Sequence, residues 1–131
     1  MKNKLEKIVK RIEKRIENIE ERLNRLENTK QKWIRIGQLE WLKDCSKKEM
    51  TWKEAKRWCK KQRGRLPTRL ELLDLYDNHF KECEKLITDS SFYTFWSVTE
   101  YSAANAWSVT LNYGSTGTNA KTGTSQVCCV R

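Results

Sequence analysis

Hydrophobic residues recur every three or four positions from Leu5 to Trp33, and no glycine or proline interrupts residues 1–36. A seven-residue repeat held this long is typical of a helix in a coiled coil rather than of a single surface helix. We therefore expect a parallel coiled coil over residues 5–33, within an oligomerisation stalk of residues 1–35. The a positions are Val9, Ile16 and Leu23, and the d positions are Leu5, Ile12, Ile19, Leu26 and Trp33.

The charges that flank this apolar seam fit a parallel assembly. All four e positions are glutamate and two g positions are arginine, so neighbouring helices can pair opposite charges. Isoleucine at both a and d, as at Ile16 and Ile19, shifts the preference from dimers toward trimers or tetramers. Residues 15–20 and 22–27 each follow the pattern Arg-apolar-x-x-apolar-Glu of short parallel trimers. We expect a homotrimer; a dimer, or a helix that packs on the chain's own globular part, are the alternatives.

The rest of the chain predicts an α+β domain over residues 36–131. Partial alternation at residues 33–42 indicates a strand or hairpin, and residues 43–48 have the composition of a polar connection. Capping boxes at Thr51–Glu54 and Thr68–Glu71 predict two helices, the first ending near residue 62 and the second running to about residue 80 or beyond.

The pattern then changes to a period of two. It predicts strands at residues 92–99, 106–111 and 126–131, with a glycine-punctuated loop or hairpin at 112–124. Two helices followed by several short strands are typical of an α+β fold.

Charge is distributed unevenly along the chain. The net charge is +10, yet residues 90–131 hold only three charged side chains, and Ser, Thr, Asn, Gly and Ala make up 24 of those 42 residues. Residues 47–69, by contrast, carry ten Lys and Arg against two Glu. An alternative function is therefore a basic module that binds nucleic acid or an anionic polymer through Lys56, Arg57, Lys60 and Lys61.

Several classes of function lack their signals. No apolar run is long enough to span a membrane, and the charged N-terminus lacks the apolar region of a signal peptide. One histidine and no Cys-x-x-Cys pair leave no pattern for a metal site, and we expect no cofactor. His79 is expected to be a surface or helix-capping residue, since no nucleophile accompanies it. We therefore expect no enzyme.

A series of motifs in residues 36–131 resembles a known family: Leu39-Glu-Trp41, Thr51-Trp52-Lys-Glu54-Ala55, Arg65-Leu-Pro-Thr68, Phe95-Trp-Ser-Val-Thr99, Ala106-Trp107 and Val127-Cys-Cys-Val-Arg131. They resemble C-type-lectin-like domains, including the C-terminal domains of some bacterial adhesins. They are more similar still to the variable proteins of diversity-generating retroelements.

In those proteins, reverse-transcription errors at template adenines replace chosen codons near the C-terminus. The resemblance therefore implies a ligand-binding domain with a variable region at about residues 93–126, and a protein or surface receptor as ligand. Trp96, Trp107, Val109, Leu111 and Val127 would be fixed scaffold. The candidate variable residues are Tyr101, Ser102, Ala104, Asn105, Ser108, Thr110, Asn112, Tyr113, Ser115, Thr116, Thr118, Asn119, Thr122, Thr124 and Ser125.

Two departures limit what the resemblance implies. The calcium-binding signatures Glu-Pro-Asn and Trp-Asn-Asp are absent, so calcium-dependent sugar binding is not expected. Cys128 stands where the family often has arginine. The resemblance suggests a disulfide between Cys59 and Cys129; buried free thiols are the alternative for the cysteines. The formylglycine-generating enzymes share the broad fold, but paired cysteines alone do not indicate their activity.

A composition rich in Tyr, Ser, Gly and Asn is also that of antibody binding loops. On composition alone, residues 101–125 could equally be a flexible polar loop. If the face binds weakly, three copies on one stalk would raise avidity by about 10²–10⁴. Display on a virion or cell surface is the location that the resemblance suggests.

Overall fold

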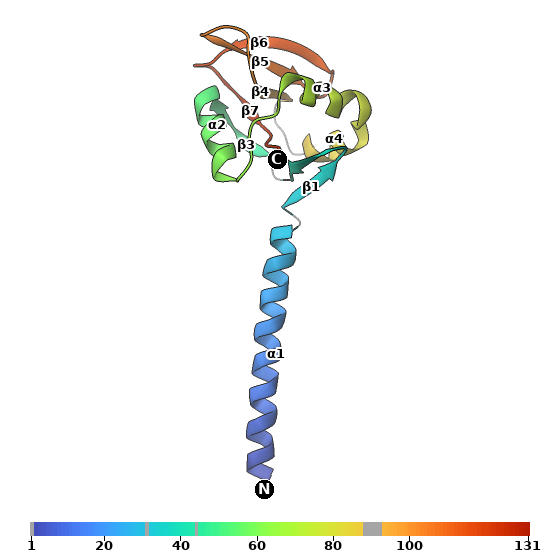
Figure 1. The fold of residues 1–131 in the computed structure, drawn as a ribbon, viewed down its shortest axis with the longest axis vertical. Helices are drawn as coiled ribbons and strands as arrows, with labels where there is room; N and C mark the ends of the chain where they lie inside the picture. The colour runs from blue at the N-terminus through green and yellow to red at the C-terminus, as the bar shows by residue number, and fades with distance from the viewer. Residues whose placement is uncertain (1, 31, 44, 88–92) are drawn as a thin grey trace. The chain divides into compact units, whose positions relative to one another are not determined.

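The computed structural model describes residues 2–30, 32–43, 45–87 and 93–131, and the chain divides into two compact units, Met1–Lys32 and Trp33–Arg131. Each unit is described by itself, and we call residues 33–131 the head. The first unit is one uninterrupted helix, α1 (Lys2–Lys30) (Figure 1). Its predicted seam is open to solvent in the single chain, where the side chains of Leu5, Ile12, Ile19 and Leu26 are all more than half exposed.

The expected last seam position, Trp33, does not belong to the helix. Trp33 begins strand β1 (Trp33–Ile36) and is 7% exposed in the core of the head. The guanidinium carbon of Arg131 lies 4.5 Å from its ring centroid. The heptad assignment was wrong here because the period of the apolar residues does not reveal that Trp33 is buried against residues far away in sequence.

The head contains two sheets. A hairpin of β1 and β2 (Leu39–Leu42) forms the small one, as the alternation at residues 33–42 predicted. The large sheet has the order β3-β7-β4-β5-β6, with bounds β3 (Ser46–Thr51), β4 (Thr94–Glu100), β5 (Asn105–Thr110), β6 (Ser115–Ala120) and β7 (Thr124–Val127). Neighbouring strands are antiparallel except β4 and β7, which are parallel.

One edge strand of the large sheet differs from the prediction, and the other confirms the predicted hairpin. Residues 43–48 were expected to be a polar connection, but β3 begins at Ser46 and pairs with β7. Residues 112–124 were expected to be a loop or hairpin; they form a hairpin turn followed by β6, which pairs with β5 along its whole length. Edge strands can remain polar on both faces, so neither one shows the apolar alternation of a half-buried strand.

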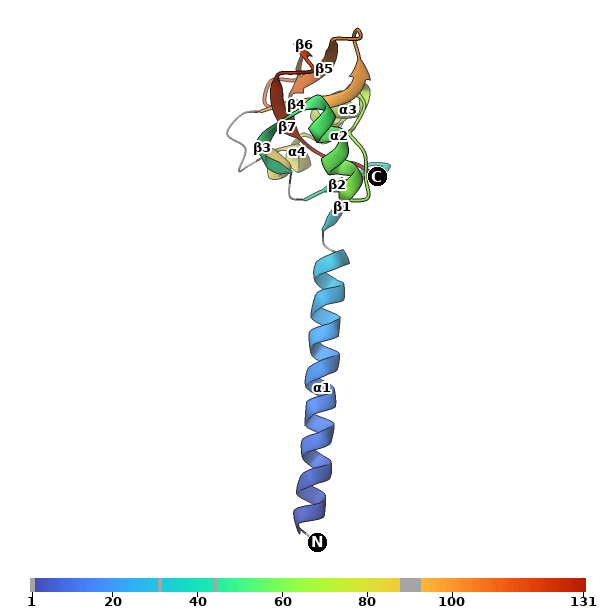
Figure 2. The same ribbon diagram turned by 90° about the vertical axis from the view of Figure 1, so that its left-hand side faces the viewer.

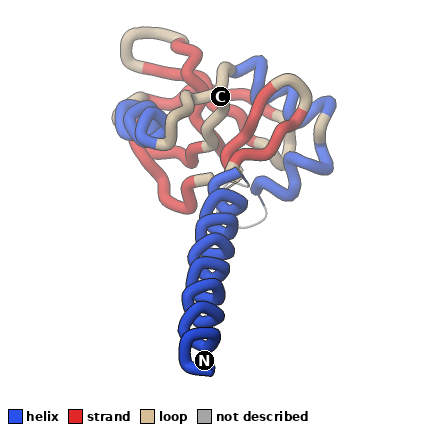
Figure 3. The backbone as a smooth tube through the Cα atoms, turned by 60° about the horizontal axis from the view of Figure 1, so that its bottom comes forward, coloured by secondary structure: helices blue, strands red, loops and turns tan. Residues whose placement is uncertain are grey.

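Helices cover both faces of the large sheet, and Figures 2 and 3 show strands between them. Helix α2 (Trp52–Lys61) begins at Thr51, whose hydroxyl accepts the N–H of Glu54. Helix α3 (Arg69–Asn78) begins with a complete capping box at Thr68. The sequence predicted one helix here that runs to about residue 80 or beyond. The chain instead breaks at His79, whose φ is −135°, and continues as α4 (Phe80–Ile87).

A bidentate ion pair reinforces the start of α3. The Arg65 guanidinium donates to both carboxylate oxygens of Glu71 at 2.7 and 2.9 Å, and Oε1 of Glu71 also accepts the Thr68 N–H at 2.8 Å. The hydrogen bonds from Arg65 are the main reason that the pKa of Glu71 lies below its usual value. The first turn of α3 is therefore fixed by side chains as well as by packing.

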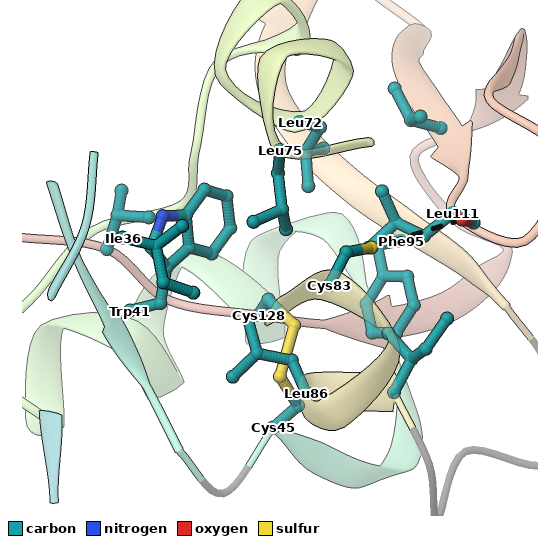
Figure 4. Packing of buried hydrophobic residues seen from close by; sticks show 13 residues of the cluster. Ile36, Trp41, Cys45, Leu72, Leu75, Cys83, Leu86, Phe95, Leu111 and Cys128 are labelled. Atoms are coloured by element: carbon teal, nitrogen blue, oxygen red, sulfur yellow. Dashed lines mark hydrogen bonds between the residues drawn. A yellow bond between two sulfur atoms is a disulfide. The ribbon is translucent and has the colours of Figure 1, made fainter. Parts of the chain in front are cut away.

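The core consists of two clusters on opposite faces of β4. Phe95 belongs to the cluster beneath α3 and α4, and the next residue, Trp96, belongs to the cluster beneath α2. Figure 4 shows the first cluster, where Leu72 and Leu75 lie together and Phe95 lies beside the sulfur atom of Cys83. Consecutive strand residues point to opposite faces, so β4 holds the two clusters together.

The vicinal cysteines follow the same alternation. Cys128 lies in the first cluster and is bonded to Cys45, while Cys129 lies in the second and is bonded to Cys59. The Cys59–Cys129 pairing suggested by the resemblance is present, and free thiols are the wrong interpretation for these four residues. Cys83 is free and buried, and burial raises the pKa of its thiol to about 11.

Candidate functional site

A polar groove of about 380 Å³ lies on the open part of the large sheet. Its lining comes from β3, β4, β5, β6 and β7 and from no helix. The lining residues are Glu49, Thr94, Ser108, Thr110, Ser115, Thr116, Gly117, Asn119, Thr124 and Ser125. Seven of these ten belong to the fifteen candidate variable residues, which the sequence alone could not place together.

Strand register explains why these side chains meet. Ser108 of β5 pairs with Gly117 of β6, and Thr110 pairs with both Ser115 of β6 and Thr94 of β4. Paired residues on neighbouring strands share a face of the sheet, so these positions all point to the same side. Gly117 has no atom within 4 Å of where a Cβ would lie, which leaves the middle of the groove open.

The floor of the groove is hydrogen-bonded to itself. The amide nitrogen of Asn119 lies 3.2 Å from the hydroxyl oxygens of both Ser108 and Ser125. Both serines are only 3% exposed, so they support the floor and present almost no surface to a ligand. The contact surface of the groove is therefore its rim, which includes the exposed side chains of Ser115 and Thr124. Thr116 pairs with the buried Val109, so its exposed side chain points to the opposite face of β6.

Glu49 supplies the one carboxylate of the lining, and it lies outside the expected variable region. Its Oε2 accepts the Thr124 hydroxyl at 3.1 Å. The backbone at the next residue, Met50, is held by the core, because its carbonyl accepts the indole N–H of the buried Trp96 at 2.7 Å. Sequence analysis missed Glu49, because the segment that carries it has no strand pattern and is far from residues 93–126.

The other eight candidates lie around the groove rather than in it. Thr118 is exposed on the opposite face of β6, and Asn112 and Tyr113 lie in the turn between β5 and β6. The end where the β4–β5 and β6–β7 turns meet holds Tyr101, Ser102, Ala104, Asn105 and Thr122. Lys121 joins those two turns, since its N–H donates to the Ala104 carbonyl and its ammonium donates to the Ala103 carbonyl, both at 2.9 Å.

Four of the five expected scaffold residues are fully buried, and Trp107 is not. Trp96, Val109, Leu111 and Val127 have no exposed surface. Trp107 is half-buried on the face of β5 opposite the groove, where its neighbours are Arg69 and Tyr101. Trp107 can therefore contact a ligand at the surface as well as support the sheet.

The basic stretch forms an exposed face of α2. Lys53, Lys56, Arg57, Lys60 and Lys61 are all exposed, while Trp52, Ala55 and Cys59 face the core. The ammonium of Lys56 lies 4.3 Å from the Trp52 ring centroid. This face and the polar groove are built by different elements of the head.

Metal-ligating side chains do not cluster in the described part of the chain, since no three His, Cys, Asp or Glu side chains come together there as a metal site would require. His79 caps the C-terminus of α3, with Nε2 3.8 Å from an Asp74 carboxylate oxygen. Among the same residues, no helix is long and apolar enough to cross a membrane.

Comparison with known proteins identifies the head. A search of curated proteins gave no match. A family model, described as the Lcl C-terminal domain, matches residues 35–131, which is most of the chain. This confirms the resemblance drawn from the motifs. The chain belongs to the Lcl C-terminal domain family, a family of C-type-lectin-like, adhesin-type domains.

Proposed function

We propose that this protein is a non-enzymatic binding protein whose head presents a retroelement-diversified surface to a protein or surface receptor. One observation carries the proposal: seven of fifteen residues chosen from sequence line a single polar groove on a sheet whose core side chains are buried. Side chains on such a rim can change without disturbing the core, since they point away from it.

The chemistry of the rim suits adaptable recognition. Serine, threonine and asparagine offer both donors and acceptors. Outside the groove, the exposed tyrosines Tyr101 and Tyr113 add large contact area with few rotatable bonds. Diversification itself has a genetic test. A near-copy of the last ~100 bases that differs at adenines, beside a reverse transcriptase gene, would support it.

Oligomerisation through α1 belongs to the same proposal. Eight large apolar side chains of α1 are about half exposed or more, and they repeat along one stripe of the helix. Burial of this stripe between copies would remove that apolar surface from water, which favours a coiled coil, and the isoleucine pattern favours a trimer. Two disulfides in the head fit folding in an oxidising compartment, which agrees with display on a virion or cell surface.

A display library tests the proposed surface. Six exposed positions would be randomised: Tyr113, Ser115, Thr116, Thr118, Thr122 and Thr124. The buried floor, Ser108 and Ser125, would be kept. We expect separate binders for two unrelated protein targets, with free energies of unfolding within about 0.5 kcal/mol of the parent, because exposed side chains contribute little to stability.

The matched control randomises six exposed positions of α2: Lys53, Glu54, Lys56, Arg57, Lys60 and Lys61. If this control library gave binders as often as the first library, or if variants of the first library generally failed to fold, the candidate variable positions would not form a dedicated contact surface.

The basic face of α2 supports the second candidate, binding of nucleic acid or another anionic polymer. The five basic residues of that face form no ion pair among the described residues. This candidate predicts that neutralising Lys56, Arg57, Lys60 and Lys61 abolishes binding to a DNA duplex, and that affinity falls steeply with salt.

A further inference from the structure

Behind the groove, three side chains form a ledge on the opposite face of the sheet: Arg69, Tyr101 and Trp107. The guanidinium carbon of Arg69 lies 3.9 Å from the centroid of the Trp107 ring. The Tyr101 ring meets the same indole edge-on, with 5.3 Å between centroids and 87° between planes. The ledge thus joins a cation to two aromatic rings at a surface where Tyr101 is 60% exposed.

Arg69 is held in place by the fold. It is the first residue of α3, and its backbone N–H donates to the Thr99 hydroxyl oxygen at 3.0 Å. Helix α3 packs on β4 and β5, and the capping box at Thr68 fixes its start. Stacking on Trp107 then restricts the side chain itself. The guanidinium is therefore oriented before any ligand arrives, and less conformational entropy is lost on binding.

The hydrogen-bonding capacity of Arg69 is not used up within the head. Arg69 makes no ion pair among the described residues, and its Nε is buried without a hydrogen-bond partner. Because Nε is buried, a carboxylate of a ligand would bond to the two terminal Nη groups. Arg65, four residues earlier, makes a bidentate pair with Glu71. Glu100 precedes Tyr101 in the sequence, but its carboxylate lies 3.4 Å from the Lys121 ammonium and forms no ion pair with Arg69.

The ledge combines fixed and candidate variable positions. Trp107 pairs with Thr118 of β6 across the ladder, and its carbonyl accepts the Ser97 hydroxyl at 2.7 Å. Tyr101 and Thr118 are candidate variable residues, whereas Arg69 and Trp107 are not. A constant cation on a constant aromatic ring is thus bordered by residues that the proposed diversification would change.

We propose that Arg69 and Trp107 form a constant anchor for an Asp or Glu side chain of a protein ligand, an inference that rests on the proposed function. A guanidinium can hold a carboxylate through two parallel hydrogen bonds, and arginine, tryptophan and tyrosine are the residues that dominate binding energy at interfaces. The anchor supplies affinity that is common to many ligands, and the neighbouring variable residues select among them.

The test uses the full chain labelled with ¹⁵N and two peptides, Ac-Gly-Glu-Gly-NH2 and Ac-Gly-Gln-Gly-NH2. We expect the Glu peptide to shift the Arg69 Nε–H and Trp107 Nε1–H signals, and the Gln peptide to bind at least about tenfold more weakly, since a charged acceptor strengthens the hydrogen bonds. Arg69→Gln should abolish the response, and Arg69→Lys should weaken it severalfold because lysine lacks the planar fork. Arg63→Gln, which removes an exposed arginine elsewhere, should leave the affinity within twofold.

Three outcomes would overturn the anchor: equal binding of the two peptides, an equal loss in Arg63→Gln, or ledge signals that respond to dextran sulfate but not to the Glu peptide. The spectrum of each variant reports whether that variant is folded. If Arg69→Gln does not fold, the comparison of the parent with Arg69→Lys still tests the anchor. The peptide result does not depend on the display library. If Arg69→Gln leaves the affinity of the library binders for their targets unchanged, the anchor is refuted but the proposed function is not. If the library gives no binders, the proposed function is refuted, and the peptide result still reports on the Arg69 site.

Discussion

Replacing Cys45 and Cys128 together with alanine is expected to lower the free energy of unfolding by about 4 kcal/mol. The bridge joins residues that are 83 positions apart, and a cross-link over so long a loop removes much of the entropy of the unfolded chain. Both sulfur atoms lie in the cluster beneath α3 and α4. The loss would be measured as the change in free energy of unfolding from urea titration.

Cys83→Ala provides the matched control for that experiment. Cys83 is buried in the same cluster but carries no bridge, so its loss should cost only roughly 1 kcal/mol, the price of a small cavity. The Cys59–Cys129 bridge spans 70 positions and should give an effect close to that of the first pair. Equal losses in Cys83→Ala and in the double variant would show that the bridge itself does not stabilise the head.

If α1 forms the proposed coiled coil, placing aspartate at Ile16 and Ile19 is expected to convert that oligomer to monomers. Both residues lie on the exposed apolar stripe of α1, and a charge buried in a coiled-coil seam has no partner there. Binding to a receptor-coated surface should then weaken by about 10²–10⁴, because each head would bind alone. Analytical ultracentrifugation would report the mass, and binding to the same receptor at high and low density would report avidity.

Asn18→Asp with Glu21→Asp introduces the same side chain off the seam and should preserve the oligomer. Retention of the oligomer in the seam variant would exclude the heptad interface. A seam variant that is monomeric yet binds as tightly as the parent would exclude avidity as the role of α1.

Local chemistry predicted the helices of the head well. Thr51 and Thr68 each cap a helix as predicted, because a cap depends on residues within one turn, although only Thr68 forms the complete capping box. The break at His79 was missed, since no glycine or proline marks it. Trp33 was misassigned because it is buried in a cluster that includes Leu42, Trp52 and Leu66, which no local pattern reveals.

The candidate site was predicted in composition but not in geometry. The unusual run of small polar residues located the rim of the groove, yet only strand register shows that Ser108 and Ser125 are buried beneath it. Glu49 and Arg69 come from segments that precede the polar tail, and their place beside it depends on the tertiary fold. Sequence patterns report which side chains are available, whereas long-range pairing decides which of them meet.

Native-state amide hydrogen exchange at β5 and β6 tests most directly whether the polar tail is a rigidly mounted contact surface. The account predicts that amides hydrogen-bonded between the paired residues of these strands, Asn105–Thr110 and Ser115–Ala120, are protected about as well as those of the β4–β5 ladder. Exchange across β6 at the rate of an unstructured peptide would contradict the account, because a mobile strand could not hold the groove in one shape.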